Sequence, residues 1–222
     1  MLPLVNDQVY HLFNRSINRE PIFKRRRNCL RALTSIEFYR FKNPPARLSY
    51  FLSWGQDRRK ELIDNLEKEN KRKVDILAYC LMPNHYHFLL KQLTKDGIRH
   101  FLSLFQNSYT RYFNTRHKRT GPIFQGIFKA IRIETDEQLI HLSRYIHLNP
   151  YSSYVVETIK ELKAYPWSSL LEYLGKADGF CQKELVFSLF DNYSKRYQKF
   201  VFDQADYQRN LEEIKHLTWE KR

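Results

Sequence analysis

Two histidines separated by a single residue, His85 and His87, are the side chains whose type and spacing most directly suggest chemistry. They begin the segment 85–92 (HYHFLLKQ), whose aromatic and aliphatic residues predict a strand. Because side chains alternate between the two faces of a strand, both imidazoles are expected on one face and Tyr86 on the other. Two imidazoles on one face can bind a divalent ion. Such a pair is more often incidental than a metal site, so the prediction needs further ligands.

A helix predicted from about residue 136 to residue 149 carries two of those candidates. Its apolar residues recur at helical spacing and predict the side that packs on a sheet. Tyr145 and Asn149 lie one turn apart on the stripe beside that apolar side. Asn149 can offer its amide oxygen as a third ligand, and Tyr145 can aim its hydroxyl at a phosphate on the same ion. A tyrosine at a core boundary and an asparagine before a proline are also ordinary helix residues, and His147 is a competing candidate on a different face.

The charge of the chain predicts a polyanionic partner. Thirty-eight Lys and Arg residues against 24 Asp and Glu residues leave a formal net charge of +14. Such a potential attracts nucleic acid, and aromatic residues interleaved with the cations suit unpaired bases. The alternative is a solvated basic flank. The candidate DNA-binding residues are Arg15, Arg25, Arg26, Arg27, Arg111, Arg116, Lys118, Arg119 and Lys129.

The order of elements predicts an α+β fold with a ferredoxin-like antiparallel sheet packed with helices. Strands are expected at 9–14, 74–82, 85–92 and 127–134, and helices at about 29–41, within 57–73, at 96–114 and at 136–149. Thr135 with Gln138 predicts a capped start for the last helix, and Pro150 predicts its end.

Two domains are expected: a catalytic domain at 1–175 with a charged helical insert at about 43–72, and a C-terminal helical appendage at 176–222. The insert reads as a solvated face, and no chemistry is assigned to it. No apolar run approaches the ~20 residues that span a bilayer, so no membrane partner is expected. Cys29, Cys80 and Cys181 form no paired motif, which favours a cytoplasmic protein with buried thiols.

The segment around the two histidines resembles the HUH signature of bacterial single-tyrosine transposases, in which two histidines flank a bulky residue. It spans residues 78–88 (AYCLMPNHYHF). Residues 145–150 (YIHLNP) resemble the helix that bears the family's nucleophile, and residues 165–169 (YPWSS) resemble the REP-associated tyrosine transposases in particular. Shorter matches lie at 10–15 (YHLFNR), 112–114 (YFN), 119–121 (RTG), 124–126 (FQG) and 173–175 (YLG).

This resemblance implies the HUH nuclease fold and a role for each site residue. His85 and His87 become paired metal ligands for Mg²⁺ or Mn²⁺, and Tyr145 becomes the nucleophile. Asn149 becomes the third ligand, at a position where insertion-sequence relatives often have glutamine. The implied activity is cleavage and strand transfer of single-stranded DNA through a 5′-phosphotyrosine intermediate, on hairpin-containing, REP-like DNA, in DNA transposition. A monomer is expected, and a dimer stays open.

Two other functions remain open from the sequence. A domesticated protein that binds hairpin DNA or RNA without transposition needs the same basic surface. A small metallohydrolase using His85 and His87 with water as the nucleophile is less favoured, because no carboxylate lies in the two motifs.

Overall fold

A four-stranded antiparallel sheet forms the centre of the computed structural model, which describes residues 3–211. Its strand order is β2-β3-β1-β4, and each neighbouring pair is antiparallel. The strands are β1 (Val9–Arg15), β2 (Val74–Met82), β3 (His85–Gln92) and β4 (Lys129–Ile133). The predicted bounds of β2 and β3 are confirmed, whereas β4 is shorter than the predicted strand at 127–134.

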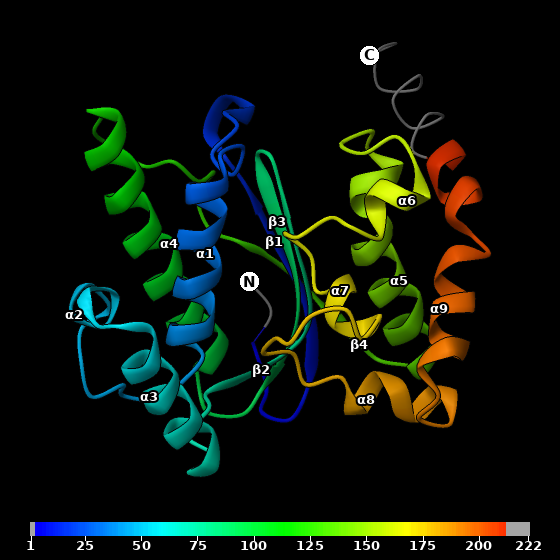
Figure 1. Ribbon diagram of the computed structural model, residues 1–222, viewed down its shortest axis with the longest axis horizontal. Coiled ribbons are helices and arrows are strands. Elements are labelled where there is room, and N and C mark those ends of the chain that lie inside the picture. The colour runs from blue at the N-terminus through cyan, green and yellow to red at the C-terminus, as the bar shows by residue number, and fades with distance from the viewer. Residues whose placement is uncertain (1–2, 212–222) are drawn as a thin grey trace.

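Helices cover both faces of this sheet (Figure 1). Helices α1 (Arg26–Tyr39) and α4 (Gly97–His117) lie on one face, and α5 (Asp136–Ser152) lies on the other. Strands and crossover helices alternate as β1-α1-β2-β3-α4-β4, with α2 and α3 inserted after α1. This order and the antiparallel pairing confirm the predicted α+β, ferredoxin-like class.

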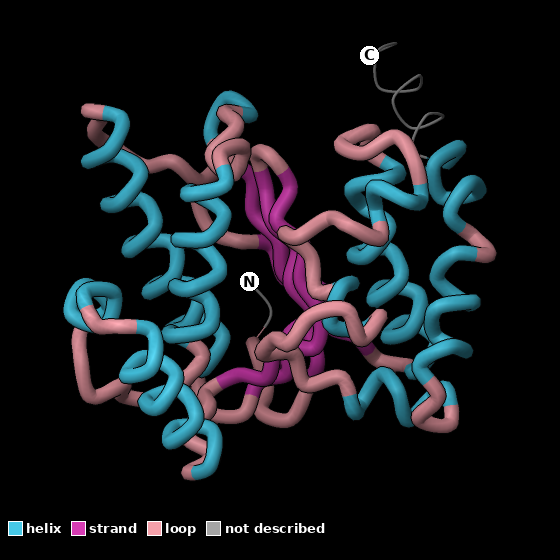
Figure 2. The backbone as a smooth tube through the Cα atoms, viewed as in Figure 1, coloured by secondary structure: helices cyan, strands magenta, loops and turns pink. Residues whose placement is uncertain are grey.

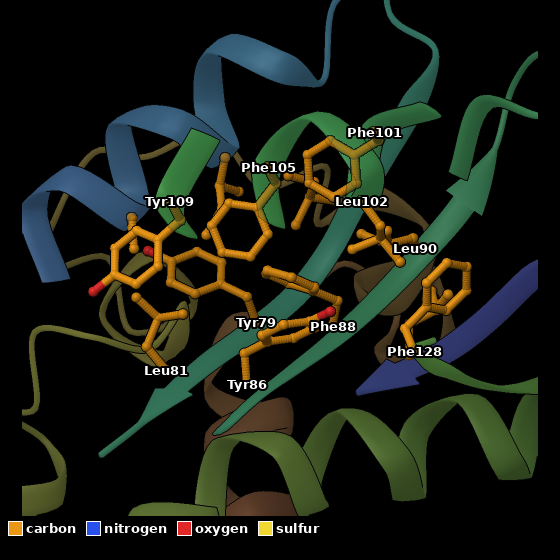
Figure 3. Close-up of a cluster of buried hydrophobic side chains, with 14 of the residues drawn as sticks. Tyr79, Leu81, Tyr86, Phe88, Leu90, Phe101, Leu102, Phe105, Tyr109 and Phe128 are labelled. Carbon is orange, nitrogen blue, oxygen red and sulfur yellow. The ribbon is translucent and has the colours of Figure 1, made fainter. Parts of the chain in front are cut away.

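Alternation along β3 sends its side chains into two separate cores. Tyr86 and Phe88 pack against Phe101 and Phe105 of α4, and Figure 3 shows these rings facing one another. Leu89, with the opposite parity, belongs to the core under α5. Each fully buried phenylalanine contributes roughly 1.5–3 kcal/mol by leaving water, so the register of β3 is strongly fixed. The histidines of β3 therefore lie on the α5 side.

The insert between α1 and β2 folds into two helices, α2 (Leu48–Ser53) and α3 (Gln56–Lys68). The expected single solvated helix is wrong in this respect, because Leu48 and Phe51 of α2 are buried against Phe38 of α1. An ion pair between Arg40 and Glu67 joins the end of α1 to α3. The insert is thus held against the α1 side of the sheet, as Figure 2 also shows.

Short helices follow α5 and return the chain to it. They are α6 (Ile159–Leu162), α7 (Leu170–Tyr173), α8 (Glu184–Phe187) and α9 (Ser194–Phe202), with single 3-10 turns at Ile17–Arg19 and Ser188–Phe190. Val186 of α8 and Tyr197 of α9 are buried in the same cluster as α5. The domain boundary at 175 stays a prediction, and the part of the predicted appendage at 212–222 lies outside the described residues.

Helix α5 does not end at Pro150 as predicted but continues to Ser152. A proline removes only its own N–H, so residues beyond it can still donate to the preceding turn. The backbone N–H of Ser153 does so, to the carbonyl of Asn149 at 3.0 Å. The predicted cap is confirmed, since Gln138 N–H donates to Thr135 Oγ1 at 3.2 Å.

The three cysteines are free and buried, as the sequence predicts. Within residues 3–211, no helix is long and apolar enough to cross a membrane.

Candidate active site

One cleft of about 700 Å³ on the α5 side of the sheet is lined by all four predicted catalytic and metal-binding residues. His85 and His87 reach it from β3, and Tyr145 and Asn149 reach it from α5. The two histidine rings are 5.0 Å apart between centroids and nearly perpendicular. Strand alternation and helix spacing thus bring together residues that lie about sixty positions apart in the chain.

Hydrogen bonds orient both imidazoles through the same ring atom. His85 Nδ1 bonds Asn84 Oδ1 at 2.7 Å, and His87 Nδ1 bonds His11 Nε2 at 3.0 Å. An amide oxygen only accepts, so His85 donates its Nδ1 proton and keeps a lone pair on Nε2. When His87 Nδ1 donates its proton to His11 Nε2, His87 likewise keeps a lone pair on its own Nε2. Metal-ligating histidines commonly donate their second ring N–H to an oriented acceptor, and this pair fits that pattern.

All three histidines of the cleft are neutral at physiological pH. Burial lowers the pKa of His11 to about 4, and burial followed by the charge of Arg15 lowers the pKa of His85 to about 4. Burial, followed by the charges of its neighbours, lowers the pKa of His87 well below its ordinary value. A neutral imidazole is the form that donates a lone pair to a cation.

Tyr145 lies against the histidines from the α5 side. Its ring meets the ring of His87 edge-on, with centroids 5.6 Å apart, and the ring of His11 at 6.3 Å. The side chain is partly buried, so it borders both the core and the cleft. This position combines a fixed ring with access to a substrate in the cleft.

Asn149 presents an amide to the same cleft one turn further along α5. The residue is 2% exposed, and its Oδ1 accepts a weak hydrogen bond of 3.5 Å from Ser153 Oγ. Among the described residues, no group of three or more His, Cys, Asp or Glu side chains is arranged to hold a metal ion. The amide oxygen of Asn149 is one of the side-chain oxygens that line the cleft together with the two histidines.

His147, the competing candidate, belongs to the core and does not line this cleft. Its Nδ1 bonds the hydroxyl of Tyr197 at 2.7 Å, and its Nε2 bonds Ser169 Oγ at 2.8 Å. Both ring nitrogens are occupied, which assigns this histidine a structural role.

The predicted DNA-binding residues divide between different surfaces. Arg15 and Lys129 line the histidine cleft. Arg27, Arg111 and Arg116 instead line a cavity between α1 and α4, across the sheet. The other four line neither cavity. Arg25 occupies the N-cap position of α1 without a side-chain cap hydrogen bond, Arg26 is the first residue of α1, Lys118 is the C-cap residue of α4, and Arg119 forms an ion pair with Glu20.

Two polar side chains of the cleft that bear on its chemistry, His11 and Arg19, are among the lining residues that the sequence did not predict. His11 lies on β1, where Tyr10 and Leu12 enter the opposite core, so alternation already points its imidazole toward α5. Its partner is not visible in the sequence, because the register pairs His11 with Leu89 and places His87 on the diagonal. Arg19 lines the cleft from the 3-10 turn after β1.

Among the comparisons with known proteins, the family match covers the motif at 78–88 and the motif at 145–150 up to Asn149. Residues 43–149 match the model of the family described as "Transposase IS200 like", and this segment is just under half of the chain. A solved structure titled "Structure of the REP associates tyrosine transposase bound to a REP hairpin" is similar over 79% of this chain and 84% of that one, with 14% identity and a TM-score of 0.49. No curated protein matches the chain. The predicted family resemblance is confirmed by the IS200-like transposase match over residues 43–149, the segment that carries His85, His87, Tyr145 and Asn149.

Proposed function

We propose that this protein is a single-tyrosine HUH transposase of the REP-associated type, which cuts and rejoins single-stranded DNA through a 5′-phosphotyrosine intermediate. The observation that carries the proposal is the cleft itself, which unites His85, His87, Tyr145 and Asn149. Neutral nitrogen ligands, an amide oxygen and a phenol in one cavity form a set suited to phosphoryl transfer at a cation.

The residues present fit Mg²⁺ or Mn²⁺. Nε2 of His85, Nε2 of His87 and Oδ1 of Asn149 would hold the ion, because hydrogen bonds already engage the other ring nitrogens. When bound, such an ion polarises the scissile phosphate and stabilises charge on its oxygens. Three uncharged protein ligands leave the full charge of the ion for that phosphate.

Tyr145 supplies the nucleophile in this proposal. Its oxygen forms a bond to phosphorus as the bond from phosphorus to the 3′ oxygen breaks, so a 3′-hydroxyl leaves and the 5′-phosphate stays on the protein. The tyrosyl phosphate keeps the energy of the broken phosphodiester, and a later 3′-hydroxyl can reverse the attack without ATP. An attacking phenol must lose its proton, and positive charge stabilises the phenolate that results. Arg15, Arg19 and Lys129 line the cleft and supply that charge.

The same cations would hold the DNA on each side of the scissile phosphate. Arg15 and Lys129 are exposed, and Lys129 lies 5.9 Å above the ring of Phe13, which also lines the cleft. Phosphate contacts with a neighbouring aromatic face suit an unpaired strand. We further propose that the substrate is hairpin-containing, REP-like DNA, that the protein acts in the cytoplasm, and that it acts as a monomer.

Trapping the covalent intermediate tests the proposal. A hairpin oligonucleotide with a single-stranded flank is labelled at its 3′ end, incubated with Mn²⁺ or Mg²⁺, and separated under denaturing conditions. The labelled fragment should migrate with the protein, only with the ion present, and mass spectrometry should map the nucleotide to the peptide that contains Tyr145. Cleavage without a covalent product would favour the water-dependent metallohydrolase. Binding of the hairpin without cleavage would favour the domesticated binder.

A further inference from the structure

A larger cavity lies across the sheet from the histidine cleft. It has a volume of about 1290 Å³ and is walled by α1, α4 and the α2–α3 insert. Those elements stand together on one side of the sheet in Figure 1, with α5 on the other side. We call this cavity the arginine groove. Its arginines within the described residues are Arg27, Arg31, Arg47, Arg59, Arg111 and Arg116.

The side chains that line the arginine groove are strongly biased towards positive charge. Among the residues that the structure describes, no Asp or Glu lines it. Each of its three walls contributes two arginines, so the positive potential converges from three directions. A concave surface of one charge concentrates the opposite charge, and an anion is the ligand that this potential favours.

Arg31 shows that the groove holds unused hydrogen-bond donors. Its Nη2 donates to Ser108 Oγ at 3.3 Å, whereas its Nε and Nη1 are buried and have no hydrogen-bond partner within residues 3–211. The Nε of Arg59, on the insert wall, is also buried and has no hydrogen-bond partner within residues 3–211. Buried donors without partners are costly, and an oxygen-rich ligand would satisfy them. Burial also lowers the pKa of Arg31, an effect that the neighbouring tyrosines Tyr39 and Tyr112 partly oppose.

The floor of the groove is apolar and aromatic. Leu30 of α1 is 46% exposed and Leu104 of α4 is 41% exposed, and both line the cavity. Tyr39 and Tyr112 line it as well, and the guanidinium of Arg31 lies 5.5 Å from the centre of the Tyr112 ring. Cations beside partly exposed aromatic rings and exposed aliphatic side chains match a ligand that carries both phosphates and flat bases.

We infer that the arginine groove binds an unpaired segment of a nucleic acid strand, with phosphates on the arginines and bases on the apolar floor. The identity of that strand as part of the DNA substrate rests on the proposed function. Because the groove lies across the sheet from Tyr145, it holds a part of the substrate remote from the scissile phosphate. The insert, which carries Arg47 and Arg59, thereby becomes a wall of a binding site.

Paired substitutions test the inference by salt dependence. The double variant Arg31→Gln, Arg59→Gln removes two charges from the groove and keeps polar side chains. Arg58→Gln is the matched control, since Arg58 is exposed on the same helix α3 and lies 4.1 Å over the ring of Trp54. Binding of a fluorescent oligothymidylate is measured by anisotropy across a range of salt concentrations. We expect the double variant to bind roughly tenfold more weakly and its log–log salt slope to flatten by about 1.4, as two phosphate contacts on a single strand are lost. The control should match the unsubstituted protein.

A second variant covers the case in which the double variant fails to fold. Leu104→Glu places one negative charge on an exposed helical position of the groove, and Tyr50→Glu does the same on α2 at a residue that is 68% exposed and does not line the groove. Only Leu104→Glu should weaken binding. An unchanged affinity and slope in folded groove variants, or a preference for duplex over single strand, overturns the inference. The unsubstituted protein is assayed in parallel for the covalent adduct: a missing adduct counts against the proposed function, whereas an adduct with unchanged slopes counts against the groove alone.

Discussion

The histidine cleft and the arginine groove lie on opposite faces of one sheet and differ in the charge state of their side chains. The cleft contains three buried histidines that are neutral at physiological pH, with a phenol beside them. The groove contains guanidinium groups, which keep their charge, and two of its arginines, Arg31 and Arg59, have buried donors without a hydrogen-bond partner within residues 3–211. Lone pairs suit bond making at a cation, whereas fixed positive charge suits holding phosphate. The two proposals therefore assign the reaction and part of the DNA binding to opposite faces of the sheet.

The largest effect is expected from Tyr145→Phe. The substitution removes one oxygen and little volume, so covalent adduct and cleavage should fall by roughly 10⁴-fold or more, as for loss of a nucleophile elsewhere. Binding to the arginine groove and the thermal midpoint should be unchanged. Tyr50→Phe, which removes the same oxygen at an exposed site on α2, is the control and should not change cleavage. Persistent cutting by the Phe variant would remove Tyr145 from the mechanism.

Structure narrows the alternatives in that outcome. Tyr109 and Tyr112, two other tyrosines of helix α4, lie across the sheet from the histidines. Tyr109 is fully buried and donates its hydroxyl proton to the carbonyl of Ile22 at 2.7 Å. Residual cutting would therefore point to water and to the metallohydrolase reading.

The next effect concerns the ligands of the cleft. His85→Ala should reduce cleavage by roughly 10²–10³-fold, because one of the ligands that position the ion is lost. Chelation of divalent ions in the unsubstituted protein should give a similar loss, which added Mn²⁺ should reverse. The affinity of groove-bound oligothymidylate should not change in either case. A chelated protein that still forms the adduct at its full rate would contradict the metal-dependent mechanism.

A smaller effect is expected from His11→Ala, which removes the hydrogen-bond partner of His87 Nδ1. Loss of such a partner weakens metal affinity or activity by roughly 10–100-fold. The Mn²⁺ concentration for half-maximal cleavage should rise, and saturating Mn²⁺ should restore much of the rate. His11→Asn keeps an accepting oxygen on a shorter side chain. Its half-maximal Mn²⁺ concentration should lie between those of the unsubstituted protein and His11→Ala. A lower rate at every Mn²⁺ concentration, with an unchanged half-maximal value, would assign His11 a structural role only.

The smallest effects are expected from single substitutions of one cation in the histidine cleft and one in the arginine groove. Lys129→Gln in the cleft should lower the cleavage rate more than the affinity for long oligonucleotides. Arg116→Gln in the groove should do the reverse, with a loss of about threefold in affinity and a slope change of about 0.7 for one contact. Single-turnover cleavage and anisotropy on the same preparations provide both values. If the two variants lost cleavage rate and affinity in the same proportion, the cleft and the groove would be parts of one DNA-binding surface.

The sequence alone determined the features that depend on local periodicity. The period of two places His85 and His87 on one face of β3, and the buried run of β2 marks its bounds. The helical period places Tyr145 and Asn149 one turn apart, and the Thr135 cap marks where that helix begins. These features follow from backbone geometry and short-range hydrogen bonds, so a sequence pattern is enough to predict them.

Tertiary structure decided what depends on the distances between elements. The strand register sets His11 beside His87, and packing keeps α5 helical beyond Pro150. Burial of Leu48 and Phe51 docks the insert, which turns a charged run into a wall of the arginine groove. The predicted DNA-binding residues divide between the two faces of the sheet. Arg15 and Lys129 on the strands line the histidine cleft, whereas Arg27, Arg111 and Arg116 on α1 and α4 line the arginine groove. Such contacts join residues far apart in the chain, and their free energy arises only when the whole core assembles.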